Sequence, residues 1–499
     1  MIDTHPVDAS TEASVGRSAA TGRTALPPHA RTVITVLLVA AFVAILNETI
    51  ISVAIPVLMR DLGIDASTGQ WLSTAFMLTL AVVIPVTGFL IQRMPSRTLF
   101  LLAMTLFSVG TLLAAVAPGF VVLLIARIVQ GSGTALMFPL LMTTVMALVP
   151  EEGRGRMMGN ISLVISVAPA LGPVVGGVVL NFLSWRWMFL VVLPIAVISL
   201  LIGVKYMTNV GETKKVRIDV LSVPLAAFGF GGLVYALNAV GSGGGLAEIG
   251  LPAAIGAVGL VTFFVRQLVL QRTDRALLDL RPFTSRIFSA SVIATSIAMV
   301  ALLGAAILLP IYLQTVLGTT PLLSGLLVLP GGVVMGVLGP IVGGLYDRVG
   351  PRALLLPGAA AVTVALGLLA MAGTDTPVWF VLVAHVVLSI GLAFMLTPLF
   401  TAGLGAVPPR YAAHGSAIFG TVQQVGGAAG TALVVTLLAI GTAAGRSQGA
   451  TALTAEASGL HLAFLVAAAV SLIALVASAF ITRPASFATP QVDGAAAAA

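Results

Sequence analysis

The sequence predicts an all-α membrane protein with 14 transmembrane helices. Its composition, its hydropathy pattern and an internal repeat all point to this class. Of the 499 residues, 59% are hydrophobic and 8% are charged, whereas soluble domains carry roughly 25% charged residues. The charges fall between apolar blocks of about 20 residues, which is the length of helix that crosses the hydrocarbon core of a bilayer. We therefore expect these blocks to span a membrane.

Fourteen such blocks follow one another along the chain. The first seven spans are expected at residues 32–57, 70–91, 98–117, 120–149, 157–182, 188–204 and 220–239. The other seven are expected at residues 249–265, 287–317, 322–346, 353–372, 378–403, 415–440 and 462–481. Residues 1–31 are polar and lack the apolar core of a signal peptide, so we expect a flexible cytoplasmic tail there and a second one at residues 483–499.

The distribution of Lys and Arg predicts the orientation, because these residues concentrate on the cytoplasmic side of membrane proteins. With the N-terminus inside, all 24 Lys and Arg residues fall on the cytoplasmic side except Arg60, Arg186 and Arg446, which fall outside, and Arg127, which lies within a span. The even number of spans returns the C-terminus to the cytoplasm. We expect a multi-pass protein of the bacterial cytoplasmic (inner) membrane.

The two ends of the chain repeat each other. The segment after span 2 that begins at Gly88 aligns with the segment after span 10 that begins at Gly343, and span 4 aligns with span 12 so that Arg127 corresponds to His385. Such repeats around a midplane site are typical of secondary transporters and disfavour a channel. We expect an N-terminal six-helix bundle at 32–207, a two-helix insertion with flanking cytoplasmic loops at 208–286, and a C-terminal six-helix bundle at 287–482.

Several functions are excluded. The net charge of +7 is spread over short loops, without the basic stripe and interleaved aromatics of a nucleic-acid interface. The chain has no Cys for a disulfide or a thiolate metal site. It also lacks a phosphate-binding P-loop, a zinc-binding HExxH motif, a GxSxG nucleophile and paired carboxylates near an interface. We expect no enzymatic activity, no nucleic-acid partner, no metal and no cofactor.

The loop after span 10 carries a spaced set of glycines and charges, namely Gly343, Asp347, Arg348, Gly350 and Arg352. Gly343 lets two helices approach closely, Asp347 can face the N-terminus of a neighbouring helix, and the arginines anchor the cytoplasmic interface. The pattern resembles the signature between spans 2 and 3 of each half of the major facilitator superfamily. The resemblance implies a latch on the inner gate, and a positively charged turn without a gating role is the alternative.

The N-terminal copy of this loop departs from the pattern. Gly88, Arg93 and Arg97 are present, but Gln92 stands at the acidic position and Pro95 stands where the second glycine is expected. We therefore expect a weaker latch in this half.

Span 4 contains Arg127, followed by Gln130, Gly131 and Gly133. A charge at mid-span costs at least about 2.5 kcal/mol, so Arg127 should face a cavity or a counter-ion. The run is similar to the second motif of the proton-coupled facilitators, in which this arginine is tied to proton coupling. An arginine that clamps backbone carbonyls between helices is the alternative.

Span 5 contains a run from Ala168 to Gly177 in which Gly172 and Gly176 permit close helix contact, and Pro173 removes a backbone donor and favours a bend. The run resembles the motif that separates drug/proton antiporters from the importers of the superfamily, so it implies export. A glycine packing face is the alternative. It accounts for the glycines, including Gly177, but less naturally for the prolines.

Span 1 contains Asn47 and Glu48 in a run that resembles the first-span motif of the 14-span EmrB/QacA-type drug antiporters. In that pattern the acid usually stands at the position of Asn47, whereas here it is one residue later, about 100° around the helix. The resemblance covers essentially the whole transmembrane region. It implies the major facilitator fold and a proton-coupled multidrug efflux antiporter that confers antibiotic resistance.

Depth along the spans places three charged or titratable residues in one layer. At 1.5 Å per residue, Glu48 lies about 14 Å from the outer end of its helix, and Arg127 and His385 lie about 11 Å from theirs. Our hypothesis is that Glu48 loads and releases the proton, that Arg127 controls its proton affinity by approach or withdrawal, and that His385 assists from the other half. A permanent Glu48–Arg127 ion pair and a His385 bonded to a backbone carbonyl are the alternatives.

The expected cargo is a drug-like, amphipathic or cationic small molecule, carried by alternating access in exchange for protons. Aromatic, polar and Met side chains suit an adaptable cavity, and the candidate lining residues are Phe42, Asn47, Phe76, Met137, Phe138, Tyr312, Gln314 and Phe394. Lipid is expected around the spans, and we expect a monomer. A lipid or glycolipid exporter on the same fold is the second reading.

Overall fold

The computed structural model describes residues 27–210, 219–241 and 243–484. Within these ranges it contains 14 long helices, four short helical turns and no strand, and each long helix is long and apolar enough to cross a membrane. The fourteen spans expected from the sequence are therefore confirmed. The expected tails lie outside the described residues, apart from residues 27–31 and 483–484.

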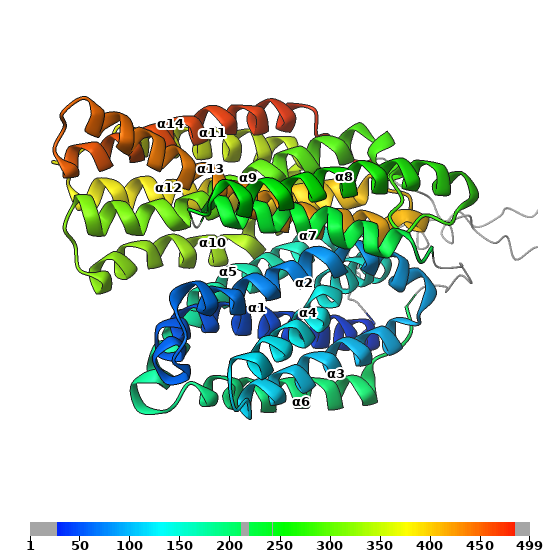
Figure 1. The fold of residues 1–499 in the computed structure, drawn as a ribbon. Helices are drawn as coiled ribbons and strands as arrows, with labels where there is room; N and C mark the ends of the chain where they lie inside the picture. The colour runs from blue at the N-terminus through cyan, green and yellow to red at the C-terminus, as the bar shows by residue number, and fades with distance from the viewer. Residues whose placement is uncertain (1–26, 211–218, 242, 485–499) are drawn as a thin grey trace, which may run out of the picture.

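The helices form two bundles with a helical hairpin beside them (Figure 1). The N-terminal bundle consists of α1 (Pro28–Leu62), α2 (Ala66–Arg93), α3 (Ser96–Ala115), α4 (Phe120–Leu148), α5 (Glu151–Phe182) and α6 (Arg186–Tyr206). The insertion consists of α7 (Ser222–Gly241) and α8 (Leu246–Leu270). The C-terminal bundle consists of α9 (Arg286–Ile311), α10 (Pro321–Val349), α11 (Arg352–Ala370), α12 (Val378–Gly405), α13 (Ala412–Ser447) and α14 (Ala452–Ala479).

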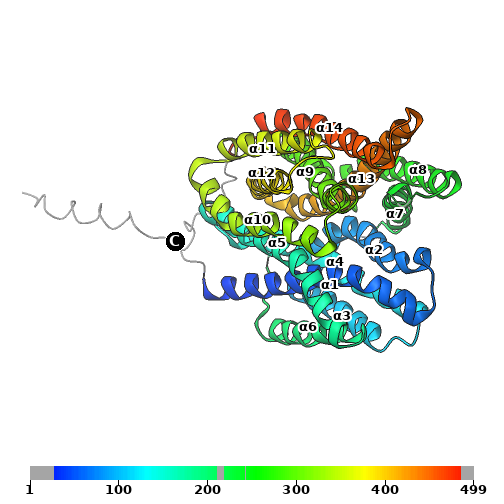
Figure 2. The same ribbon diagram turned by 90° about the vertical axis from the view of Figure 1, so that its left-hand side faces the viewer.

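The two bundles repeat the same packing. In the N-terminal bundle α1 packs on α5 and α6, α2 on α4, and α3 on α4 and α6. In the C-terminal bundle α9 packs on α13 and α14, α10 on α12, and α11 on α12 and α14. The bundles meet through two equivalent pairs, α5 with α10 and α13 with α2. The insertion packs against α2 and α13, at the second of these pairs (Figure 2).

We call the end of the molecule where α1, α5 and α13 begin the basal end, and the opposite end the distal end. Side chains of the two bundles contact one another in the basal half. The Ser162 and Thr397 hydroxyls lie 2.7 Å apart across α5 and α12, and the Thr143 hydroxyl donates to Ser416 across α4 and α13 at 3.2 Å. On the outer surface of the molecule, α8 presents Val258 with 69% of its side chain exposed, as a lipid-facing helix would.

Several helices extend beyond the predicted apolar spans, and two of them begin at least six residues earlier than predicted. Helix α14 begins at Ala452 rather than at residue 462. Thr451 caps it by accepting a hydrogen bond from the Thr454 amide, and the first turns continue as a helix although they contain Glu456. Helix α5 begins at Glu151 rather than at residue 157, with two acids in its first turn. Hydropathy finds the apolar part of a helix and misses polar first turns.

Candidate functional site

The Arg127 side chain is completely buried on α4 and is held by uncharged groups. Its Nε donates to the Leu72 carbonyl of α2 at 3.2 Å, and its Nη1 donates to Gln130 Oε1 at 3.1 Å. The guanidinium carbon lies 4.1 Å from the centroid of the Phe76 ring. Gln130 in turn donates to the Thr111 hydroxyl of α3 at 2.9 Å. Arg127 thus joins α2 to α4 and, through Gln130, to α3.

Glu48 lies on α1, within range of electrostatic interaction with Arg127. Glu48 is partly exposed. The neighbouring Asn47 is 2% exposed, and the side-chain amide nitrogen of Asn47 lacks a hydrogen-bond partner among the described residues. In the described ranges the ion pairs belong to Arg154, Arg266 and Arg281, and none joins Glu48 to Arg127. The acid and the base are neighbours without direct contact in this conformation.

Gly172 of α5 lies directly against Thr49, the residue after Glu48. A Cβ atom at position 172 would lie 2.1 Å from Thr49 Oγ1, so no side chain fits there. Gly176 is also buried, but a Cβ at Gly177 would have nothing within 4 Å. Helix α5 continues through Pro173 without a break. The glycine run therefore sets the close packing of α5 on α1 next to the carboxylate.

The glycines of the α4 motif have a similar role. A Cβ at Gly133 would lie 2.4 Å from the Ala103 carbonyl oxygen of α3, and a Cβ at Gly131 would lie 3.1 Å from the Thr79 side chain of α2. They bring α2 and α3 close enough for their groups to surround the Arg127 side chain.

His385 lies between α12 and α10, within the C-terminal bundle. Its Nε2 is 3.1 Å from the Val328 carbonyl oxygen, and a Cβ at Gly331 would lie 2.3 Å from the same nitrogen. Its Nδ1 has no hydrogen-bond partner among the described residues. The structure brings Glu48 and Arg127 together and places His385 against α10, with its interactions inside its own bundle.

Asp347 joins the two bundles at the basal end. Its carboxylate accepts from the backbone amide of Gly155 at 2.8 Å and from that of Arg156 at 3.0 Å, both in the first turns of α5. A Cβ at Gly343 would lie 2.1 Å from the Gly155 carbonyl oxygen, so the glycine permits the close approach of α10 to α5. Gly350 ends α10 at a φ of 80°, which favours glycine.

The arginines of the two loops lie elsewhere. Arg348 and Arg352 are exposed, and so is Arg93 at the end of α2. Arg97 donates to the Val204 carbonyl at 2.6 Å and so ties α3 to α6 inside the N-terminal bundle. The Asp347 carboxylate and Gly343 make the contact between α10 and α5.

The candidate cavity residues have different surroundings. Phe76 and Met137 are buried, Phe42 is partly buried, and Phe138 packs edge-on against Phe400 of the other bundle with ring centroids 5.8 Å apart. Tyr312 lies in a turn of π-helix that follows α9 (Tyr312–Val316) and donates to the Gly373 carbonyl at 2.6 Å. Gln314 is exposed, and Phe394 lies against Gly358 of α11. Tyr312 and Phe394 thus serve packing within the C-terminal bundle.

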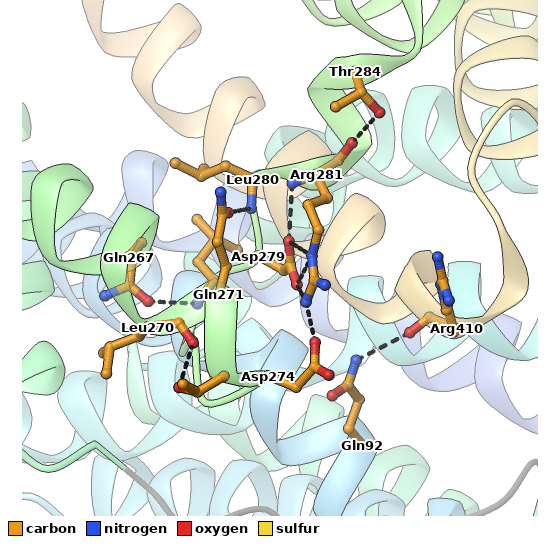
Figure 3. Close-up of polar contacts among 12 residues, drawn as sticks. Gln92, Gln267, Leu270, Gln271, Asp274, Asp279, Leu280, Arg281, Thr284 and Arg410 are labelled. Carbon is orange, nitrogen blue, oxygen red and sulfur yellow. Dashed lines mark hydrogen bonds and ion pairs between the residues drawn. The ribbon is translucent and has the colours of Figure 1, made fainter.

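Sequence reasoning missed a polar cluster at the basal end, in the loop between α8 and α9. Arg281 is bonded there to Asp274 and to Asp279, and these hydrogen bonds, chiefly those to Asp279, raise the pKa of Arg281 (Figure 3). The signal in the sequence was four charges within the eight residues 274–281, next to a helix end. We also find a cavity of about 400 Å³ between α2, α4, α12 and α13, lined in part by Thr143, Arg154 and Arg410.

These features define a class: a polytopic membrane protein of two repeated six-helix bundles, with a buried charge layer and a polar contact between the bundles. The sequence profile of the Major Facilitator Superfamily matches residues 37–431. The chain belongs to this superfamily and is a membrane transporter.

Relatives with drug-resistance names are similar along most of the chain. The Lincomycin resistance protein LmrB of Listeria monocytogenes is 39% identical over 392 residues, covering 78% of this chain and 83% of that protein. The Uncharacterized MFS-type transporter YcnB of Bacillus subtilis is 40% identical, covering 92% and 96%. The Multidrug resistance protein B homolog of Mycobacterium tuberculosis is 29% identical, covering 79% and 73%.

Solved structures share the fold at low identity. The human organic anion transporter MFSD10 superposes with a TM-score of 0.63 at 15% identity, covering 91% of this chain and all of that one. The proton:xylose symporter XylE superposes with a TM-score of 0.64 at 14% identity, covering 90% and 94%.

Proposed function

We propose that the protein exports drug-like, amphipathic or cationic small molecules across the bacterial cytoplasmic membrane in exchange for protons, by alternating access. The observation that carries this proposal is the pair Glu48 and Arg127. A partly exposed carboxylate lies within electrostatic range of a buried guanidinium that neutral partners already hold. Such a carboxylate is free to bind a proton or a cationic group.

In this scheme the distance between Glu48 and Arg127 determines whether the Glu48 carboxylate holds a proton. A carboxylate in a low-dielectric site holds a proton when no cation is near and loses it when an arginine approaches. Because Arg127 is anchored to α2 and α4, small movements of α1 against α4 change that separation. Gly172 packs α5 against Thr49, so a movement of α5 is transmitted to α1 at the residue next to the carboxylate.

His385 is proposed to assist from the C-terminal bundle. It is the repeat counterpart of Arg127, and its Nδ1 is unpartnered within the described ranges while Nε2 lies against a carbonyl. A ring in this state has a position left for a proton or a water molecule.

We place the basal end in the cytoplasm, in line with the distribution of positive residues. The contacts between the bundles through Asp347, Ser162 and Thr143 then close the cytoplasmic side. The structure would in that case be an outward-facing conformation with Gly343, Asp347 and Gly88 at its closed gate. The protein is proposed to act as a monomer.

Transport by purified protein in proteoliposomes tests the proposal. A cationic dye and lincomycin serve as probes, since lincomycin appears in the name of a relative. We expect dye export that a protonophore abolishes, and we expect Glu48→Gln to lose it. Asp61→Asn is the matched control, because Asp61 is an exposed acid at the distal end of the same helix.

The outcomes separate the alternatives. Full proton-coupled transport by Glu48→Gln would disprove the role of this carboxylate. Transport of a fluorescent phospholipid with no transport of dye or lincomycin would favour the lipid exporter. His385→Gln is expected to slow export roughly tenfold without uncoupling it, and an unchanged rate would remove His385 from the scheme.

A further inference from the structure

The two contacts between the bundles at the basal end are equivalent by the repeat. Gly343 of α10 lies against Gly155 and Gly159 of α5. Gly88 of α2 lies in the same way against α13, where its Cβ would be 3.3 Å from the Ala413 carbonyl oxygen and 3.2 Å from the Ala417 side chain. The alignment of α4 with α12 also pairs Gly155 with Ala413. The two contacts therefore join equivalent positions of the repeat, with the closer approach at Gly343.

Their polar contacts are unequal. Among the described residues, Asp347 accepts two backbone hydrogen bonds on the α10 side, whereas Gln92 on the α2 side donates one to the Arg410 carbonyl at 3.3 Å. Hydrogen bonds to a charged group are roughly twice as strong as those between neutral groups. Judged by the hydrogen bonds of Gln92 and Asp347, the α2–α13 contact is thus weaker than the α10–α5 contact.

The α4–α5 turn and the α12–α13 turn, next to these contacts, are also stabilised by different side chains. Between α4 and α5, Arg154 donates to the Val149 carbonyl at 3.1 Å and to the Met146 carbonyl at 3.0 Å. The equivalent turn between α12 and α13 contains the short helix Pro409–Tyr411, and the repeat places Ala412 at the position of Arg154. The turn has an arginine of its own, Arg410, whose guanidinium carbon lies 4.7 Å from the Tyr411 ring centroid. Unlike Arg154, it donates no hydrogen bond to a carbonyl of its turn within the described ranges.

A second arginine, from the insertion loop, also lies against this turn. The Arg281 guanidinium carbon lies 4.7 Å from the centroid of the Tyr411 ring. Asp279, which is 3% exposed, accepts from Arg281 Nε at 2.9 Å, and Asp274 accepts from Nη2 (Figure 3). Gln92, Asp274, Asp279, Arg281, Arg410, Tyr411 and the buried His414 together line one cavity of about 270 Å³.

The loop that carries Arg281 is fixed to the insertion. The buried Gln267 of α8 accepts from the Leu277 amide at 2.8 Å and from the Leu278 amide at 3.2 Å, and its own amide group donates to the Ser222 hydroxyl at the start of α7 at 2.7 Å. Since α7 packs on α2 and α13, and α8 packs on α7, the insertion supports Arg281 beside the gate.

We propose that Arg281 is a positioning residue of the basal gate: held by Asp274 and Asp279 and stacked on Tyr411, it fixes the α12–α13 turn so that the Arg410 carbonyl meets Gln92. In this way the insertion supports the weaker α2–α13 contact, as Arg154 supports the α10–α5 contact. This inference rests on the proposed alternating access, because a latch has a role only if the bundles separate at this end.

Cysteine labelling tests this directly, because the chain contains no Cys. Ser416→Cys is the reporter. Ser416 is fully buried and accepts a hydrogen bond from the Thr143 hydroxyl, between α13 and α4. A membrane-impermeant maleimide is added to inside-out vesicles, where it reaches the basal end. We expect Arg281→Gln to speed labelling roughly tenfold, as loss of a charged hydrogen-bond network would.

Three further variants make the result specific. Arg275→Gln changes an exposed arginine of the same loop and is expected to leave labelling unchanged. Tyr411→Leu removes the ring on which Arg281 and Arg410 both stack and is expected to speed labelling, which keeps the test valid if Arg281→Gln does not fold. Asp347→Asn weakens the α10–α5 contact and reports whether the bundles separate at the basal end.

The outcomes are distinct. Faster labelling with Asp347→Asn but an unchanged rate with Arg281→Gln and Tyr411→Leu would overturn the role of Arg281 and leave the proposed transport cycle intact. Unchanged labelling in all of these variants would overturn both the latch and a basal gate. Equal acceleration by Arg275→Gln would also count against the proposal, since loop charge alone would then be responsible.

Discussion

The guanidinium of Arg127 lies over the ring of Phe76, with 4.1 Å between its central carbon and the ring centroid. Both side chains are completely buried. The charge is therefore stabilised by the ring, by the Leu72 carbonyl and by the Gln130 amide oxygen, rather than by an ion pair. An arginine held in this way keeps its charge in a low-dielectric layer and leaves Glu48 free.

The first prediction concerns this ring. A desolvated cation–π contact contributes about 2 kcal/mol, so Phe76→Leu should lower the free energy of unfolding by about 2 kcal/mol more than a substitution that removes only apolar contacts. Phe107→Leu is the control, since Phe107 is equally buried in the same bundle. Reversible unfolding in detergent measures both, and equal losses would show that the ring does not stabilise Arg127.

The second prediction separates two glycines of α5. Gly172→Ala should reduce stability by about 1–3 kcal/mol and slow export, because the new Cβ would meet Thr49 Oγ1 at 2.1 Å. Gly177→Ala should do neither, because nothing lies within 4 Å of that position. Thermal unfolding and dye export are the measurements. If the two variants behave alike, close packing of α5 on α1 is not what the motif provides.

The third prediction separates two adjacent glycines of α10. Gly343→Ala places a methyl group 2.1 Å from the Gly155 carbonyl oxygen, whereas Gly344→Ala meets nothing within 4 Å. We expect Gly343→Ala alone to hold α10 away from α5 and to speed maleimide labelling of a Ser162→Cys reporter, whose hydroxyl faces Thr397 across the bundles. Equal labelling in both backgrounds would contradict a gate at this contact.

The fourth prediction is a pH dependence outside the spans. Hydrogen bonds from Arg266, followed by those from the Ser222 hydroxyl and amide, lower the pKa of Asp219 from 3.8 to about 2. A carboxylate whose pKa falls on folding stabilises the protein above its unfolded pKa, and this contribution disappears as the pH falls from about 4 to about 2. Asp219 is 11% exposed and Arg266 34%, so we expect about 1–2 kcal/mol after allowance for solvent screening.

Asp219→Asn measures that contribution. At pH 7 the variant should unfold at lower denaturant concentration than the parent, and the two should converge as the pH is lowered toward 2. A difference that stays constant across this range would mean that the ion pair between Asp219 and Arg266 is not the source of the stability.

Much of this protein could be predicted from the sequence because the information is local. A bilayer demands about 20 apolar residues per span, so the spans and their order follow from hydropathy alone. The repeat likewise identified Arg127 with His385 and Gly343 with Gly88. The departure of Gln92 from the acidic pattern likewise predicts a weaker latch in the N-terminal half.

The contacts themselves depended on the tertiary structure, because they join segments far apart in the chain. Glu48 and Arg127 share a layer by residue count, but only the packing of α1, α2 and α4 shows that neutral groups hold Arg127 and that no ion pair forms. The placement of Arg281 beside Tyr411 depends on how the insertion docks against α2 and α13. Periodicity encodes which residues enter the membrane, whereas side-chain packing between distant helices decides which of them meet.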